Sequence, residues 1–172
     1  MKLEFVLILL STLACTAQAR MPSKAVVTSC LAAQENSAAI TWRPLPTHKI
    51  YSTDNYIDGF NAVYYIQSAG KVIGYAEQGK IKAILYDDQL FPITRARALS
   101  GFDTPPTELN PFVAEWSTVT DHSGSYLCIS FPYGDLGQSG RFQKNRSAYL
   151  IATEKTKTQR VLYSATGNVD AP

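Results

Sequence analysis

The stretch at residues 115–131, EWSTVTDHSGSYLCISF, decides the fold class because it is the strongest hairpin signal in the chain. Two runs rich in β-branched and aromatic residues, at 115–120 and 125–131, flank the polar segment 121–124, which contains Gly124. Runs of this composition, joined by a short glycine-containing turn, are typical of antiparallel hairpins. We therefore predict a hairpin here and expect further strands to extend it into a sheet.

Several other segments have the short, apolar composition of strands. Ile81, Ala83 and Leu85 alternate with other residues, which places them on one face of a strand. Pro92 confines its segment to an edge, an end or a bulge, since proline cannot donate to a β-ladder. Besides the hairpin above, we predict strands at residues 25–30, 38–42, 71–75, 80–86, 89–93, 148–153 and 160–165.

One segment, residues 52–69, has the pattern of a helix. Ser52 is a good N-cap, and Ile57, Phe60 and Tyr64 recur at the spacing of one helical face. A glycine directly after the segment is a natural C-terminal stop. We therefore expect an α+β domain in which one main helix packs on an antiparallel sheet.

The first nineteen residues have the features of a secretory signal peptide. Lys2 precedes an apolar run at 5–14, and Ala17 and Ala19 form a small-residue cleavage site. We predict that residues 1–19 are removed and that residues 20–172 form a single secreted domain. The run is too short for a transmembrane helix, which needs about 20 residues, and no membrane association is expected. Lipidation at Cys15 is the alternative.

Cysteine usage follows from this prediction. Loss of Cys15 leaves Cys30 and Cys128, and two cysteines in an exported chain indicate one disulfide. Two free buried thiols are the alternative. His48 and His122 are far apart in the sequence and no C-x-x-C motif is present, so we expect no metal site and no cofactor.

Charge is unevenly distributed, although the net charge is only +2. Residues 136–172 combine lysines and arginines with aromatic residues, which is what contact with a phosphate backbone and stacking on bases require. The alternative is a solvated hairpin whose lysines protect an edge strand. The candidate nucleic-acid contacts are Arg141, Lys144, Arg146, Tyr149, Lys155, Lys157 and Arg160.

Three segments in order resemble one known family. They are Tyr51-Ser52 with the segment up to Gly70, the run Leu90-Phe91-Pro92-Ile93, and the hairpin at 116–131. In this order they resemble the opening helix, a strand ending in aromatic-Pro-aliphatic, and the late core hairpin of small secreted fungal guanyl-preferring ribonucleases. Ribonuclease-like secreted effectors of powdery mildew fungi share that fold, and they are similarly short and exported, with two cysteines. This chain departs from them because Cys128 lies far from the C-terminus and a basic hairpin follows it.

The catalytic residues of that family do not carry over. RNA cleavage needs a general base, a general acid and a cation on the phosphate. The stretch that matches the first catalytic histidine is Tyr75-Ala76-Glu77, and Leu90 stands where the family has a glutamate. Glu115-Trp116 matches the arginine position, and Ser130-Phe131 lies where the second histidine would fall. The resemblance thus implies a ribonuclease-like scaffold without catalysis.

From these observations we expect a secreted effector or interaction protein, monomeric, that binds a host protein or RNA and can be delivered into a host cell. One alternative is an active guanyl-preferring ribonuclease whose catalytic groups lie elsewhere in the chain. Another is an extracellular or periplasmic binding or inhibitor domain of unrelated α+β fold.

Other motifs have simpler interpretations. His122 beside Asp121 is read as a turn residue rather than part of a triad, because triads are assembled in space. We interpret Asp87-Asp88 as polar residues at a strand end, since no calcium-loop spacing completes them. Asn145 begins the one glycosylation sequon, and its use depends on the source. Cys30, Trp42 and Cys128 also resemble the immunoglobulin pattern, but the cysteine separation is long for that fold.

Overall fold

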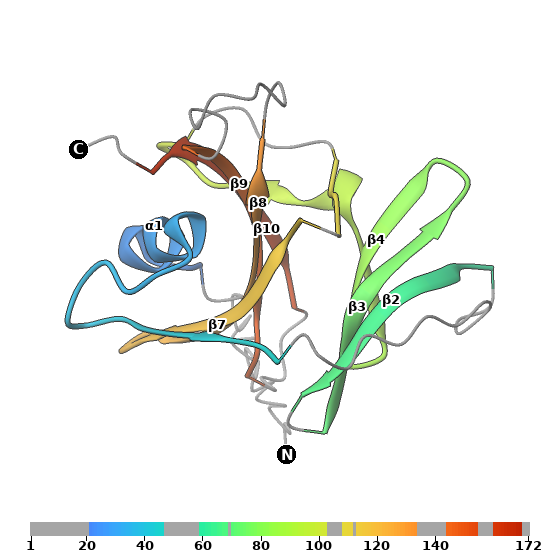
Figure 1. The fold of residues 1–172 in the computed structure, drawn as a ribbon, viewed down its shortest axis with the longest axis horizontal. Helices are drawn as coiled ribbons and strands as arrows, with labels where there is room; N and C mark the ends of the chain where they lie inside the picture. Colours follow the sequence, from blue (N-terminus) through green and yellow to red (C-terminus); the bar gives the residue numbers. More distant parts are fainter. Residues whose placement is uncertain are drawn as a thin grey trace, which may run out of the picture.

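The computed structural model describes residues 21–46, 59–68, 70–102, 108–111, 113–133, 144–154 and 160–169. Within them the chain forms one α-helix and two sheets (Figure 1). The expected signal peptide at 1–19 lies outside the described residues. In chain order the elements are α1 (Lys24–Ala32), β1 (Thr41–Pro44), β2 (Asn61–Ser68), β3 (Lys71–Gln78), β4 (Ile81–Tyr86), β5 (Gln89–Pro92), the 3-10 helix η1 (Ile93–Arg95), β6 (Arg97–Ala98), β7 (Glu115–Asp121), β8 (Gly124–Pro132), β9 (Asn145–Ala152) and β10 (Leu162–Asn168).

The larger sheet contains six strands in the order β1-β7-β8-β9-β10-β6. All of its neighbours are antiparallel except β10 and β6, which are parallel. The hairpin predicted at 115–131 is confirmed as β7 and β8, and the C-terminal hairpin is confirmed as β9 and β10. In the β7–β8 turn, the Asp121 carboxylate accepts hydrogen bonds from the backbone N–H groups of Ser123 and Gly124.

The smaller sheet contains β2, β3, β4 and β5 in that order, all antiparallel. The helix predicted at 52–69 is wrong over residues 61–68, which form β2, whereas residues 52–58 lie outside the described part. Ile66 is paired with Ile73 of β3, and β2 is rich in the Val, Tyr and Ile residues that favour strands. Gly70, expected to end a helix, instead has φ of 73° between β2 and β3.

The helix α1 replaces the strand that we predicted at 25–30. Ser23 is its N-cap, and the Val26 N–H donates to the Ser23 hydroxyl over 3.2 Å. Val26, Val27 and Cys30 are buried at helical spacing. Val26 and Val27 are β-branched residues of a type common in strands, but burial of one helical face overrides that weak local preference.

The described chain forms three layers, with α1 on one face of the six-stranded sheet and the four-stranded sheet on the other (Figure 1). Side chains of β8 alternate between the two cores, as the period of a strand requires. Leu127 and Ile129 belong to the core shared with the smaller sheet, whereas Tyr126 and Cys128 belong to the core shared with α1. The α+β class is therefore confirmed.

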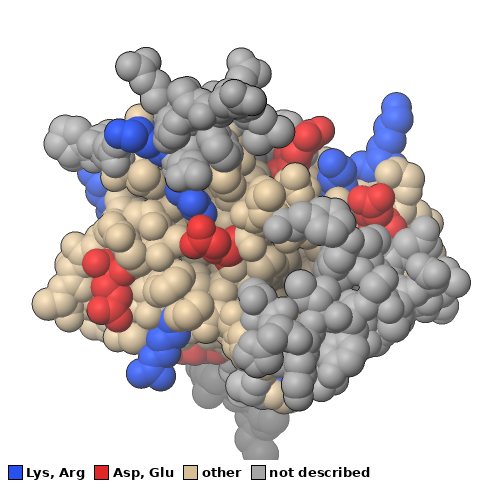
Figure 2. All heavy atoms as spheres, viewed as in Figure 1, with Lys and Arg blue, Asp and Glu red and all other residues tan. Residues whose placement is uncertain are grey.

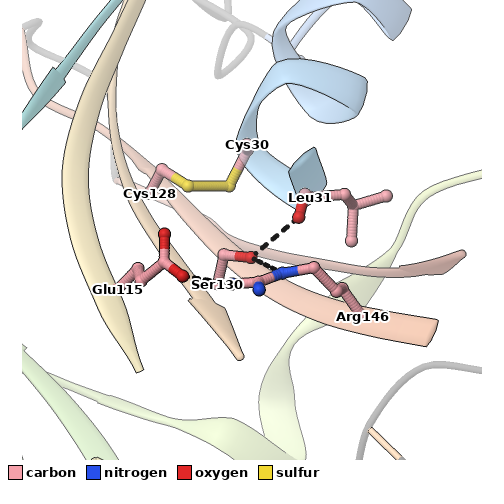
Figure 3. Close-up of a disulfide and its surroundings, with 6 residues drawn as sticks. All are labelled: Cys30, Leu31, Glu115, Cys128, Ser130 and Arg146. Atoms are coloured by element: carbon pink, nitrogen blue, oxygen red, sulfur yellow. Dashed lines mark hydrogen bonds and ion pairs between the residues drawn. A yellow bond between two sulfur atoms is a disulfide. The ribbon is translucent and has the colours of Figure 1, made fainter. Parts of the chain in front are cut away.

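The predicted disulfide is also confirmed. Cys30 of α1 is bonded to Cys128 of β8, which is 98 positions later in the chain (Figure 3). Both cysteines are completely buried. The bond fixes α1 to a central strand of the larger sheet.

Candidate anion-binding cleft

A cleft of about 430 Å³ lies where edge strands of the two sheets come together. The outer strand β5 of the smaller sheet contributes Gln89–Pro92, and β6, the outermost strand of the larger sheet, contributes Arg97. Its volume is within the usual range of small-ligand pockets, roughly 300–1,000 Å³. The remaining lining residues are Arg95, Arg160, Val161 and Leu162.

Three arginines make this cleft cationic. Arg95 ends η1, Arg97 begins β6 and Arg160 lies just before β10. Arg95 and Arg97 are exposed, and within the described residues neither guanidinium makes a hydrogen bond or an ion pair. Two guanidinium groups without a partner in the described part of the chain, on one concave surface, give a site that can bind an anion through planar, bidentate hydrogen bonds.

Arg160 is held in a different way from the other two arginines. Its Nη2 donates to Oδ2 of Asp87 over 3.0 Å, and its Nη1 donates to Oε1 of Gln89 over 3.5 Å. The guanidinium carbon also lies 5.0 Å from the centroid of the Tyr86 ring, within the range of a cation–π contact. Arg160 therefore has a fixed place in the wall of the cleft.

Tyr86 connects this wall to the larger sheet. The Lys71 ammonium donates to the Tyr86 hydroxyl over 2.8 Å and to the Thr153 carbonyl oxygen over 3.1 Å. Lys71 also lies 5.1 Å from the Tyr86 ring centroid. Because Lys71 and Tyr86 belong to the smaller sheet and Thr153 follows β9, these contacts hold the two sheets together beside the cleft.

The sequence candidates for nucleic-acid binding are largely separated by the structure. Arg141, Lys155 and Lys157 lie outside the described residues, and Lys144 is exposed before β9. Tyr149 is completely buried in the core, so its ring has no face on which a base could stack. Arg160 is the candidate that lines the cleft.

Arg146 is also a buried structural residue, with 9% of its surface exposed. Its Nε donates to the Ser130 hydroxyl over 3.0 Å, and its NH2 group is 3.2 Å from Glu115 (Figure 3). Ser130 in turn donates to the carbonyl oxygen of Leu31, near the end of α1. The Arg146 guanidinium therefore stabilises the packing of α1 and is enclosed by protein.

Sequence reasoning missed Arg95 and Arg97 as site residues. They lie in the connection after β5, and the only sequence feature that could have linked them is that they are two residues apart. That spacing indicates a shared face only if the segment is extended, and the connection contained no convincing strand pattern. On the face shown in Figure 2, basic and acidic side chains of the described residues are interspersed.

The positions that match ribonuclease catalytic residues have structural partners instead. Glu77 accepts a hydrogen bond from the Tyr75 hydroxyl over 2.9 Å, Glu115 pairs with Arg146, and Ser130 bonds to Leu31. Leu90 lines the cleft but carries no titratable group. His122 is exposed in the β7–β8 turn.

The titration of the buried tyrosines fits a structural role. Burial, reinforced by the hydrogen bond to Glu77, raises the pKa of Tyr75 well above its ordinary value. Burial also raises the pKa of Tyr149 and of Tyr163, with the charge of Arg97 opposing the rise at Tyr163. All three phenols are therefore neutral at physiological pH.

Within the described residues, no group of three His, Cys, Asp or Glu side chains is placed to hold a metal ion. No helix in that part of the chain is long and apolar enough to cross a membrane. No family model matches the chain, and no curated protein or solved structure is significantly similar to it.

Proposed function

We propose that this chain is a secreted effector or interaction protein that binds single-stranded RNA through the arginine-lined cleft and has no catalytic activity. The observation that carries the proposal is the convergence of Arg95, Arg97 and Arg160 on one cleft, two of them without a partner among the described residues. Export is part of the proposal, and the buried disulfide supports it because disulfides persist in oxidising compartments.

Phosphate is the anion that this lining suits best. Arginine binds phosphate through paired N–H groups in a rigid fork, and such contacts supply most of the affinity in nucleic-acid complexes. The cleft also has an apolar part formed by Leu90, Phe91 and Val161, and Phe91 and Val161 are only half-buried. An aromatic side chain beside a cationic groove is the arrangement that binds single strands by stacking.

The proposal assigns no catalysis to the cleft because none of its described lining residues is a general acid or base at neutral pH. Its described lining consists of arginines, one glutamine and apolar residues. Arginine remains protonated in proteins and a glutamine amide does not titrate, so neither can transfer a proton at neutral pH. A purified preparation should leave single-stranded RNA and guanyl dinucleotides intact.

The scaffold is a separate part of the proposal. The β7–β8 hairpin and the Leu90–Pro92 segment support a ribonuclease-like fold, whereas β2 occupies residues 61–68, where the resemblance requires a helix. This strand favours the alternative that the chain is a binding domain of unrelated α+β fold. The proposed RNA site depends on the cleft and is the same in either case.

The test is RNA binding by variants with matched charge changes. Fluorescence anisotropy of a labelled single-stranded RNA would compare the wild type with Arg95→Gln/Arg97→Gln. The control is Lys24→Gln/Arg43→Gln, which removes the same charge from two exposed residues outside the cleft. We expect the cleft variant to bind about tenfold more weakly or worse at low salt, and the control to change affinity by less than about threefold.

Three outcomes would count against the proposal. Undetectable wild-type binding at low salt removes RNA as the ligand. Equal losses in the two double variants show that binding follows overall charge and not the cleft. The wild type could also capture an acidic host protein that the cleft variant no longer binds, while both bind RNA equally. That result would show that the cleft binds a host protein and not RNA.

A further inference from the structure

The turn beside the cleft has a positive φ angle at both of its residues. Tyr86 pairs with Gln89, so β4 and β5 are joined by a two-residue turn made of Asp87 and Asp88. Their φ angles are 52° and 63°. Two-residue turns with positive φ at both positions favour Asn or Asp at the first position and glycine at the second. Asp87 therefore fits its position, whereas Asp88 stands where glycine is preferred.

Asp87 and Asp88 differ in their side-chain contacts. Asp87 forms the 3.0 Å ion pair with Arg160, and both side chains are largely buried, with exposed fractions of 20% and 11%. The Asp88 side chain is exposed and has no partner within the described residues. The two residues share the same type, turn and backbone region, and differ in their relation to the cleft.

We propose that Asp87 is a positioning residue for the cleft: it orients the Arg160 guanidinium toward a bound phosphate, and the two-residue turn between β4 and β5 places its carboxylate beside Arg160. This inference rests on the proposed function, because it assigns a role within the same site.

The contacts of Arg160 explain how the orientation works. The Arg160 Nη2 donates to the Asp87 carboxylate, and its Nη1 donates to Gln89. The Tyr86 ring centroid lies 5.0 Å from the guanidinium carbon. A guanidinium has five N–H donors in a fixed plane, so fixing part of the group also fixes the direction of the remaining donors. The ligand then meets an arginine whose conformational freedom is already restricted, which lowers the entropic cost of binding.

The test compares Asp87→Gly with Asp88→Gly. Each variant removes one carboxylate and places glycine at a position of positive φ, so their charge and backbone changes match. The variants differ in the contact with Arg160. We expect Asp87→Gly to bind labelled single-stranded RNA about fivefold more weakly than Asp88→Gly, although both carry the same net charge.

A spectroscopic measurement makes the test independent of RNA. The Nε–H signal of Arg160, assigned by its loss in Arg160→Lys, reports the order of the guanidinium in the free protein. We expect this signal to be sharp in the wild type and in Asp88→Gly, and to be broadened or lost by exchange in Asp87→Gly. Asp87→Asn keeps an oxygen acceptor at this position and tolerates positive φ, so it should retain most of the signal and of the affinity.

The outcomes separate the two proposals. If the Arg160 signal in Asp87→Gly matches that of the wild type, the positioning role is wrong, whatever the RNA affinity of the variant. Equal RNA affinity of the two glycine variants overturns it as well. Wild-type protein that shows the expected Arg160 signals but no RNA binding refutes the proposed ligand and confines the role of Asp87 to ordering Arg160.

Discussion

The Ser23 hydroxyl donates a hydrogen bond to Oδ2 of Asp121 over 2.7 Å, although the two residues are 98 positions apart. Ser23 caps the N-terminus of α1, and Asp121 begins the turn of the β7–β8 hairpin. This contact fixes one end of the helix to the larger sheet, and the bond between Cys30 and Cys128 fixes its second half. A nine-residue helix is too short to be stable alone in water, so these attachments account for its presence.

Asp121→Asn should destabilise the protein at neutral pH by about 1–2 kcal/mol, since hydrogen bonds to a charged acceptor are stronger than neutral ones. Burial raises the pKa of Asp121, but hydrogen bonds from Ser123, Ser23 and Gly124 outweigh it and lower the pKa below its ordinary value of 3.8. A group with a lowered folded-state pKa stabilises the protein above the unfolded pKa and loses this contribution as the pH falls through the folded one.

The difference in unfolding free energy between wild type and Asp121→Asn should therefore shrink below about pH 4. Urea denaturation at neutral pH and at about pH 3 would measure it. Asp88→Asn is the control, because that carboxylate is exposed and unpartnered within the described residues. A difference that is the same at both pH values would show that the Asp121 charge contributes nothing.

Removal of the disulfide should cost about 4–5 kcal/mol in the chain-entropy model, because the bond closes a loop of 98 positions. Denaturant unfolding of Cys30→Ala/Cys128→Ala would test this, with reduced wild type as the comparison that keeps both sulfur atoms. Peptide mapping without reductant should recover the two cysteines cross-linked. Free thiols in freshly folded protein would contradict the structure.

The sequence predicted the elements whose signals are local. The β7–β8 hairpin is confirmed because its two runs and its turn are adjacent, so no distant partner is needed to define it. Residues 61–68 show the limit of such reasoning. Ile57, Phe60 and Tyr64 fit a helical face, but pairing with β3 decides the state of the segment from position 61 onward. Propensity is a weak signal against tertiary pairing of this kind.

The cleft could not be predicted for a related reason. Arg95 and Arg97 come from a connection between the sheets, whereas Arg160 precedes the last strand. They meet because β6 is parallel to β10, with Arg97 paired to Tyr163. A two-residue strand has almost no sequence signal, so neither this pairing nor the resulting arginine cluster can be derived from composition. Arg160 was predicted because it belongs to a stretch that combines basic and aromatic residues, and the same criterion also selected the buried Arg146.

Arg146→Met should destabilise the protein by about 1.5–3 kcal/mol and leave RNA affinity within about twofold of the wild type. Methionine keeps the apolar length of the side chain but removes the donors to Ser130 and Glu115. Arg43→Met is the control, because it makes the same change at an exposed position of β1. If a folded Arg146→Met binds RNA more weakly and Arg43→Met does not, Arg146 contacts phosphate as the sequence predicted.

Asp88→Gly should stabilise the protein by about 0.5–1 kcal/mol, because glycine adopts positive φ without the strain of a side chain. The measured quantity is the free energy of unfolding in denaturant. Asp88→Asn removes the same charge while keeping a side chain at this position, so it separates the effect of backbone strain from that of charge. Equal stability of the two variants would indicate that the turn is not strained at this residue.

The dependence of RNA affinity on salt concentration reports how many phosphates bind in the cleft. Each phosphate of a single strand that an arginine neutralises contributes about −0.7 to the slope of log affinity against log salt, so three contacts predict a slope near −2. Arg95→Gln/Arg97→Gln should leave about −0.7, from Arg160 alone. The slope of Lys24→Gln/Arg43→Gln should stay near that of the wild type. Anisotropy titrations over a salt series would measure these slopes, and a cleft variant with the wild-type slope would show that the bound phosphates lie elsewhere on the protein.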